Sequence, residues 1–125
     1  MRKFKFTKGI TYIFCLGGMF GLFKELYYLF KFLSDLSYPE KDLGDITFLI
    51  CSGIILLYLR TSFLEESAKK ILQYAGFAAI FEGLRHVVYT SFRSFSATVF
   101  LYGANIFFII LVIINCFFHL KRLQS

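Results

Sequence analysis

Charged residues are scarce in this sequence. They make up 18% of its 125 residues, whereas hydrophobic residues make up 58%, above the roughly 45–50% that is typical of soluble domains. A soluble domain this small leaves a large share of its surface exposed, so it could not hide this much apolar surface from water. The composition therefore excludes an ordinary soluble protein and predicts that a lipid bilayer surrounds most of the chain.

Residues that break helices and patterns that mark an active site are also rare. The only proline, Pro39, lies in the polar stretch at residues 34–45, where it interrupts no helix. The sequence has no internal repeat, no Gly-rich phosphate loop and no nucleophile–base–acid pattern. We therefore expect a non-enzymatic protein.

Cysteines are few and show no motif. Cys15, Cys51 and Cys116 fall in three different apolar segments, without a Cys-x-x-Cys sequence or the spacing of a metal site. A free cysteine usually behaves as a small buried apolar side chain. We expect buried, unreactive thiols.

The net charge of +6 does not indicate a nucleic-acid-binding protein. Such a protein needs a continuous basic patch, whereas the Lys and Arg residues here flank the apolar segments. Four of them lie in the first eight residues and two in the last five. Charge at such flanks orients membrane helices, so we expect no nucleic-acid partner.

Four long apolar segments predict an all-α, four-helix transmembrane bundle in one domain, residues 1–125. The expected helices cover about residues 9–33, 45–60, 67–92 and 95–120. The first has about 24 residues and would be ~36 Å long, which is enough to span a bilayer with some tilt. Its basic start resembles a secretory signal, but no small residues mark a cleavage site, so we expect an uncleaved helix. Ser67 is the predicted N-cap of the third helix.

Four spans would place both termini on the same side of the membrane. Nine Lys and Arg residues then lie on that side and three on the other. The positive-inside rule therefore predicts cytoplasmic termini, in a bacterial inner membrane or an organellar membrane. The nine are Arg2, Lys3, Lys5, Lys8, Arg60, Lys69, Lys70, Lys121 and Arg122, and the three are Lys31, Lys41 and Arg93.

The third segment carries ionisable residues in its apolar interior. Glu82, Arg85 and His86 are spaced i, i+3 and i+4, which places them on one face of a helix. Such groups are costly inside a membrane unless they face a partner or a watery cavity, so they mark a functional-site hypothesis. Lys24 and Glu25 lie at a comparable depth in the first helix, and their charges cancel with those of Glu82 and Arg85. We predict one buried polar network between the first and third helices.

Two interpretations of this network remain open. In the first, it only locks the packing of the helices, helped by small residues of the third segment that let neighbouring backbones approach closely. These small residues are Ala75, Gly76, Ala78, Ala79 and Gly83.

In the second interpretation, the five ionisable residues form a ligand or ion site. Glu82 and His86 could then bind a metal ion, joined by Cys51 or Cys116 if the packing of the helices brings these thiols close. The sequence identifies neither the metal nor any other cofactor.

One set of residues resembles the pattern of ethylene-receptor-type membrane sensor domains. It consists of Asp42, Tyr58, Gly76, Gly83 and His86. In that family an acidic residue opens the first of three helices, and a Cys-Gly-x-x-His sequence on the second binds Cu(I). Glu82 stands where the family has this cysteine, and a thiolate is what selects Cu(I). The resemblance therefore implies a sensor-like helical bundle and argues against copper and ethylene binding.

A second stretch, Gly83-Leu-Arg-His-Val-Val-Tyr89, is similar to the Gly-x-Arg-His segment of succinate dehydrogenase cytochrome b anchors. That resemblance implies a membrane anchor for a redox complex. In that family a haem-ligating histidine stands where this chain has Ala79, and an aspartate stands where it has Thr90. These departures argue against haem ligation.

Together these patterns predict a small polytopic membrane protein that acts through helix–helix contacts, as an accessory subunit or a sensor-type component of a membrane complex. Its expected partners are the lipid bilayer and another protein or further copies of itself. The alternatives are a homo-oligomer that forms a channel or transporter, with the charged residues lining a pathway, and a quinone- or haem-binding anchor.

Overall fold

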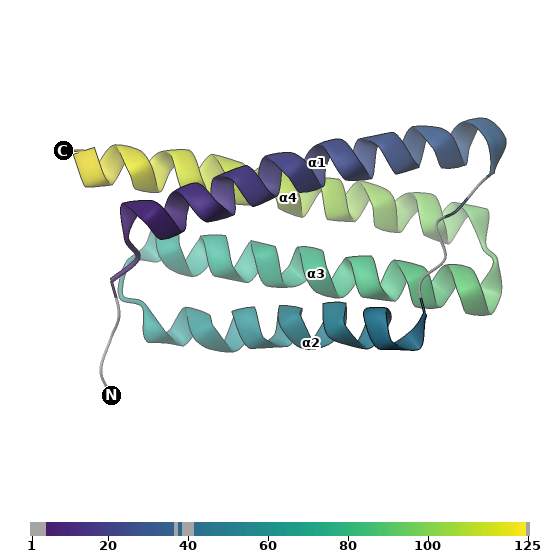
Figure 1. Cartoon of the computed structure of the whole chain (residues 1–125), viewed down its shortest axis with the longest axis horizontal. Helices are drawn as coiled ribbons and strands as arrows, with labels where there is room; N and C mark the ends of the chain where they lie inside the picture. Colours follow the sequence, from purple (N-terminus) through teal and green to yellow (C-terminus); the bar gives the residue numbers. More distant parts are fainter. Residues whose placement is uncertain (1–4, 37, 39–41, 125) are drawn as a thin grey trace.

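The computed structural model describes residues 5–36, 38 and 42–124, and these form four long helices (Figure 1). They are α1 (Lys8–Asp35), α2 (Leu43–Leu59), α3 (Glu66–Phe92) and α4 (Phe95–Gln124), with a 3-10 turn, η1 (Arg60–Ser62), after α2. The prediction of an all-α fold with four helices is confirmed, and the helix ends differ from the expected ones by at most four residues. Residues 37 and 39–41 of the polar stretch at residues 34–45 lie outside the described residues.

Short polar side chains fix the starts of two helices. The side-chain oxygens of Thr7 and Asp42 accept hydrogen bonds from the backbone N–H three residues later, at 3.3 and 2.8 Å, which caps α1 and α2. The predicted N-cap of α3 is wrong. Glu65 occupies that position, and Ser67 lies inside the first turn of the helix, because its hydroxyl contacts α4 instead.

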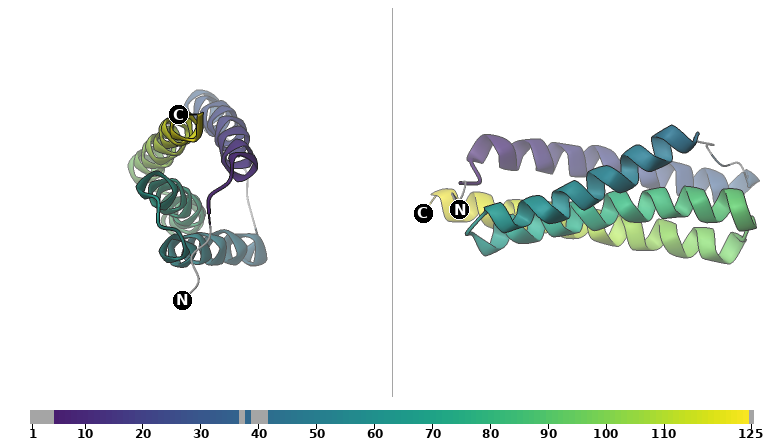
Figure 2. Two further views of the ribbon diagram at one scale, coloured as in Figure 1. Left: turned by 90° about the vertical axis from the view of Figure 1, so that its left-hand side faces the viewer. Right: turned by 90° about the horizontal axis from the view of Figure 1, so that it is seen from below.

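The four helices form a curved row rather than a closed bundle. α1 packs against α4, α4 against α3, and α3 against α2, and the end-on view shows the resulting open arrangement (Figure 2, left). α1 and α2 follow each other in the sequence, yet they lie at opposite ends of this row. α3 and α4 therefore form the centre of the fold.

Three helices are long and apolar enough to cross a membrane. These segments are Lys8–Asp35, Leu43–Ser62 and Phe95–Leu123. Phe20, Phe48 and Phe100, one from each, are 74%, 72% and 72% exposed, as expected of side chains that face lipid. α3 is not among them, so the prediction of four apolar spans is supported for three helices only. The reason is that α3 carries a polar first turn and the ionisable residues of its interior.

α2 and α3 approach each other closely at glycines. A Cβ atom built on Gly53 would lie 2.6 Å from the carbonyl oxygen of Gly76, and one on Gly76 would lie 2.8 Å from that of Gly53. A Cβ atom on Gly83 would lie 2.6 Å from Cγ1 of Ile50. The prediction that small residues of the third helix permit close packing is confirmed at Gly76 and Gly83, since any side chain there would push the helices apart.

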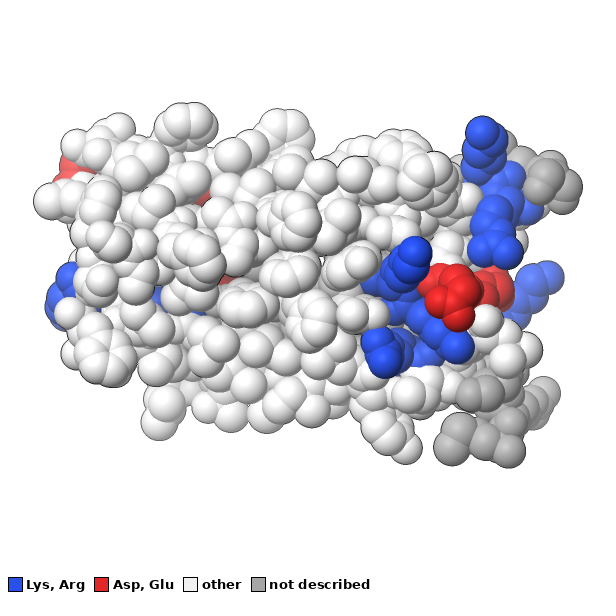
Figure 3. Space-filling model, turned by 180° about the vertical axis from the view of Figure 1, so that it is seen from behind, with Lys and Arg blue, Asp and Glu red and all other residues white. Residues whose placement is uncertain are grey.

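Most charged side chains lie at the ends of the molecule. Basic side chains gather at the end of the molecule where α1 begins and α4 ends, on the right in Figure 3. The face between the two ends is almost free of charge. Seven described Lys and Arg residues belong to this end, against Lys31 and Arg93 at the other. Arg2, Lys3 and Lys41, which also entered the predicted asymmetry, lie outside the described residues.

Candidate functional site

Two ion pairs join α1 to α3. Nζ of Lys24 lies 2.9 Å from Oε1 of Glu82, and the guanidinium of Arg85 binds both carboxylate oxygens of Glu25. Nη2 of Arg85 also lies 3.9 Å from Oε1 of Glu82, which links the two pairs. The predicted polar network between the first and third helices is confirmed for these four residues.

The two pairs differ in burial. The side chains of Arg85 and Glu25 are 2% and 1% exposed, whereas those of Lys24 and Glu82 are 36% and 12% exposed. A buried pair stabilises a fold only when its remaining donors are also satisfied. Arg85 has further partners besides Glu25: its Nε donates to Oη of Tyr38 at 3.1 Å, and its Cζ lies 4.0 Å from the centre of the Tyr102 ring.

Tyr38 closes one end of the space between α1 and α3. It comes from the connection between α1 and α2, outside the helices, and its ring stacks on that of Tyr89 with centroids 4.1 Å apart. Burial raises the pKa of the Tyr38 phenol, while the charge of Arg85 acts in the opposite direction. The phenol is therefore neutral and accepts the hydrogen bond from Arg85.

His86 is the fifth predicted site residue. Its side chain is buried, and its ring meets that of Tyr38 edge-on at 5.1 Å. In the described part of the chain, no three His, Cys, Asp or Glu side chains come together as metal ligands do. Cys116 lies in the apolar core with Phe6, and Cys51 is exposed on α2. The packing therefore does not bring these thiols to His86, and the expectation of a buried thiol is wrong for Cys51.

A second polar cluster lies at the end with the termini, and sequence reasoning missed it. The ring of His119 is 1% exposed, and its Nδ1 lies 2.6 Å from Oγ of Ser67. Its Nε2 lies 2.9 Å from the carbonyl oxygen of Phe6 and 3.3 Å from a carboxylate oxygen of Glu65. His119 thereby joins α4, the start of α3 and the segment before α1. The sequence signal that could have indicated this cluster is His119, a single histidine in the apolar run of the fourth helix.

Phe6 fills the core at this end. Its side chain is fully buried, and its ring contacts those of Phe14, Phe63 and His119 at 5.3–5.7 Å between centroids. An apolar residue from the segment before α1 thus packs between the helices, just as Tyr38 does at the opposite end. Both ends of the space between α1 and α3 are closed by an aromatic side chain from outside the helices.

Between these two closures lies an apolar hollow of about 220 Å³, the central cavity. Its floor is α4 and its walls are small residues of α1 and α3. The lining residues are Ile13, Phe14, Gly17, Gly18, Gly21, Ala75, Ala78, Ile109 and Val112. A Cβ atom built on Gly17 would meet no described atom within 4 Å, so a side chain at this position would find open space.

The arrangement therefore offers a fixed ion-pair network, an apolar hollow beside it and a basic end, and within the described residues no cluster suited to metal binding. Comparisons with family models, with curated proteins and with solved structures found no match for this chain, so both family resemblances remain predictions.

Proposed function

We propose that this protein is a small, non-enzymatic integral membrane protein that works as an accessory subunit of a membrane complex. Three apolar helices with exposed aromatic side chains support its place in a bilayer. The ion pairs allow α3 to join them, since its charges are neutralised before they meet lipid. In this arrangement the network stabilises the fold and binds no substrate.

We place the end with both termini in the cytoplasm. Lys5, Lys8 and the five basic residues of η1, α3 and α4 near this end support that orientation, because cytoplasmic flanks carry an excess of Lys and Arg. The opposite end carries acidic residues as well as Lys31 and Arg93.

The central cavity is the observation that carries the proposal. Gly17 and Gly21 stand four residues apart on α1 and face the same hollow as Ala75 and Ala78 of α3. Small residues at such spacing let a neighbouring helix approach closely in a membrane. One turn of a helix, about 5.4 Å long and 10 Å wide, would occupy roughly 400 Å³. The cavity therefore suits the side chains that a partner helix inserts, and not the helix itself.

The test is the mass of the native assembly. The tagged chain, purified in mild detergent, should emerge in a heteromeric complex. The variant Gly17→Leu should lose the partner while keeping the thermal stability of the wild type. Gly103→Leu is the matched control, because a Cβ atom on Gly103 also meets no described atom within 4 Å, and Gly103 lies outside the cavity.

Two results would overturn the proposal. A closed homo-oligomer with Glu82 facing its axis would assign the charged residues to a pore or carrier. A monomer that is stable in the cell without any partner would remove the role of a subunit.

A further inference from the structure

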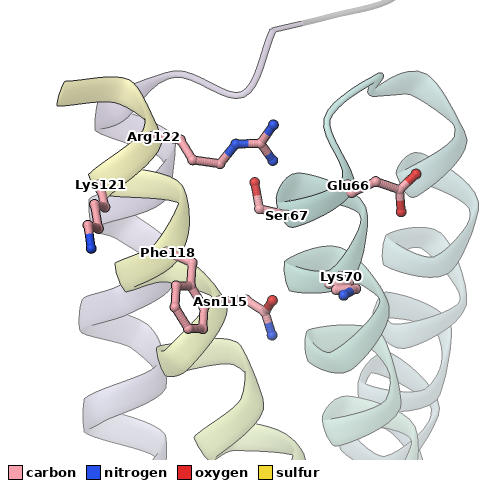
Figure 4. Close-up of a pocket in the computed structure, with 7 residues that line it drawn as sticks. All are labelled: Glu66, Ser67, Lys70, Asn115, Phe118, Lys121 and Arg122. Atoms are coloured by element: carbon pink, nitrogen blue, oxygen red, sulfur yellow. The ribbon is translucent and has the colours of Figure 1, made fainter. Parts of the chain in front are cut away.

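A second, larger cavity lies between the start of α3 and the end of α4. We call it the basic cavity; its volume is about 500 Å³. Four of its seven lining residues carry charge, and Figure 4 shows the guanidinium of Arg122 extending into the space between the two helices. The lining residues are Glu66, Ser67, Lys70, Asn115, Phe118, Lys121 and Arg122.

Positive charge dominates this lining. The lining contains three basic residues, Lys70, Lys121 and Arg122, and one acidic residue, Glu66. The carboxylate of Glu66 lies 3.8 Å from Nζ of Lys69. The lining of one cavity thus includes cations from two different helices, three in all, and one acidic side chain. A guanidinium offers several N–H donors in a planar fork that matches phosphate oxygens, and an ammonium adds a compact point charge.

Polarity changes along the cavity. The guanidinium of Arg122 and the hydroxyl of Ser67 face each other across the space between α4 and α3, and the amide of Asn115 lies further into the molecule (Figure 4). Beside Asn115 the wall is the ring of Phe118, which is 60% exposed. The charged end and the apolar wall match a molecule that has an anionic head and an apolar tail.

The site is held in place by the neighbouring cluster. Nδ1 of His119 fixes the hydroxyl of Ser67 at 2.6 Å, and Nδ2 of Asn115 donates to the carbonyl oxygen of Leu111 at 2.8 Å. His119 in turn is held by the backbone of Phe6. Ser67 and Asn115 are therefore held in place before any ligand arrives.

We propose that the basic cavity binds a phosphate ester, and that its source is the headgroup of an anionic phospholipid. The inference rests on the proposed place of the chain in a membrane, where this end of the helices lies at the level of the headgroups. Basic hollows between membrane helices favour anionic headgroups on the cytoplasmic side. A soluble phosphate ester has the same anionic phosphate group as the lipid, but it has no acyl chain that could pack against the ring of Phe118.

The experiment measures lipid binding to the full-length chain in a neutral detergent, by native mass spectrometry and by the shift in melting temperature. Phosphatidylglycerol should bind and raise the melting temperature by several degrees. Phosphatidylcholine, whose headgroup has no net charge, should bind at least tenfold more weakly, and inorganic phosphate at the same concentration should not displace the bound lipid.

A matched pair of variants tests the position of the site. Lys121→Gln with Arg122→Gln should weaken phosphatidylglycerol binding at least tenfold. Lys5→Gln with Lys8→Gln removes the same charge from the same end, outside the cavity, and should change binding less than twofold. Lys70→Gln is a second probe that leaves α4 intact, with an expected loss of at least threefold.

Three outcomes would overturn the inference. Equal weakening by both pairs of variants would mean that the lipid is attracted by diffuse charge. Equal binding of the two lipids would remove the anionic selectivity, and displacement by inorganic phosphate would assign the cavity to a soluble ligand. The role as an accessory subunit is tested by a different result. A monomer that still binds phosphatidylglycerol in this cavity would refute the subunit role and leave the lipid site intact.

Discussion

Arg85 and Glu25 form a bidentate ion pair across the space between α3 and α1, although 60 residues separate them in the sequence. Both side chains are almost completely buried. α1 packs along α4, so this pair and the neighbouring Lys24–Glu82 pair fix its position relative to α3.

Removing one charge of the buried pair should destabilise the fold strongly. Glu25→Gln leaves the guanidinium of Arg85 buried without its counter-ion, which costs about 3–5 kcal/mol. Denaturant titration in detergent would measure this loss. Replacing both residues by methionine should recover most of the stability, since no uncompensated charge is left. Full stability of Glu25→Gln alone would contradict the buried-pair interpretation.

The second pair should contribute less. Nζ of Lys24 binds Glu82 at 2.9 Å, but the lysine side chain is 36% exposed, so it can turn outward when its partner is lost. We expect Glu82→Gln to cost about 1 kcal/mol, within the range for partly exposed pairs. The same titration measures it, and a loss as large as that of Glu25→Gln would show that the two pairs act as one unit.

Contact between α2 and α3 should not tolerate a side chain at Gly76. Because a Cβ atom there would lie 2.8 Å from the carbonyl oxygen of Gly53, Gly76→Ala should lower stability by about 1–3 kcal/mol through overpacking. Gly103→Ala is the control, because its Cβ atom meets no described atom within 4 Å. The control should be neutral or raise stability by up to about 1 kcal/mol through helix propensity. Equal melting temperatures for the two variants would contradict this close approach.

Loss of His119 should release the segment before α1. The ring holds the carbonyl oxygen of Phe6 and the hydroxyl of Ser67, so His119→Ala removes both contacts and opens a cavity beside Phe6. Trypsin cleavage after Lys5 and Lys8 should then become several-fold faster, as measured by mass spectrometry of the products. Phe117→Ala, at an exposed position of α4, should leave the cleavage rate unchanged.

Tyr38 should make the stability depend on alkaline pH. Burial raises the pKa of its phenol in the folded chain, whereas the unfolded value is about 10. The resulting stabilisation is complete below pH 10 and is lost as the pH rises towards the folded pKa, because only the unfolded phenol ionises. The fall in melting temperature between pH 9 and 11 should therefore be steeper in the wild type than in Tyr38→Phe. Parallel curves would contradict this role.

Features that depend on the pattern within a single helix could be predicted from the sequence. Apolar length defines the four helices, and the spacing of Glu82 and Arg85 places them on one face. Charge neutrality then pointed correctly to Lys24 and Glu25, because buried ions need partners.

Features that depend on packing between distant segments were missed. Ser67 has the residue type of an N-cap, but its hydroxyl is taken by His119, 52 residues away. Phe6 and Tyr38 lie outside the helices, and nothing local distinguishes a buried aromatic residue there from an exposed one. The arrangement of the helices in a curved row could not be predicted either, because it depends on which faces of α3 and α4 pack against each other.

The ion pairs between α1 and α3 also impose an order on biosynthesis. Glu25 leaves the ribosome 60 residues before Arg85, and at about 5–20 residues per second this interval lasts roughly 3–12 s. During that time the newly made α1 carries Lys24 and Glu25 without the residues that neutralise them in the finished fold. The first helix to be made is therefore among the last to take its final place.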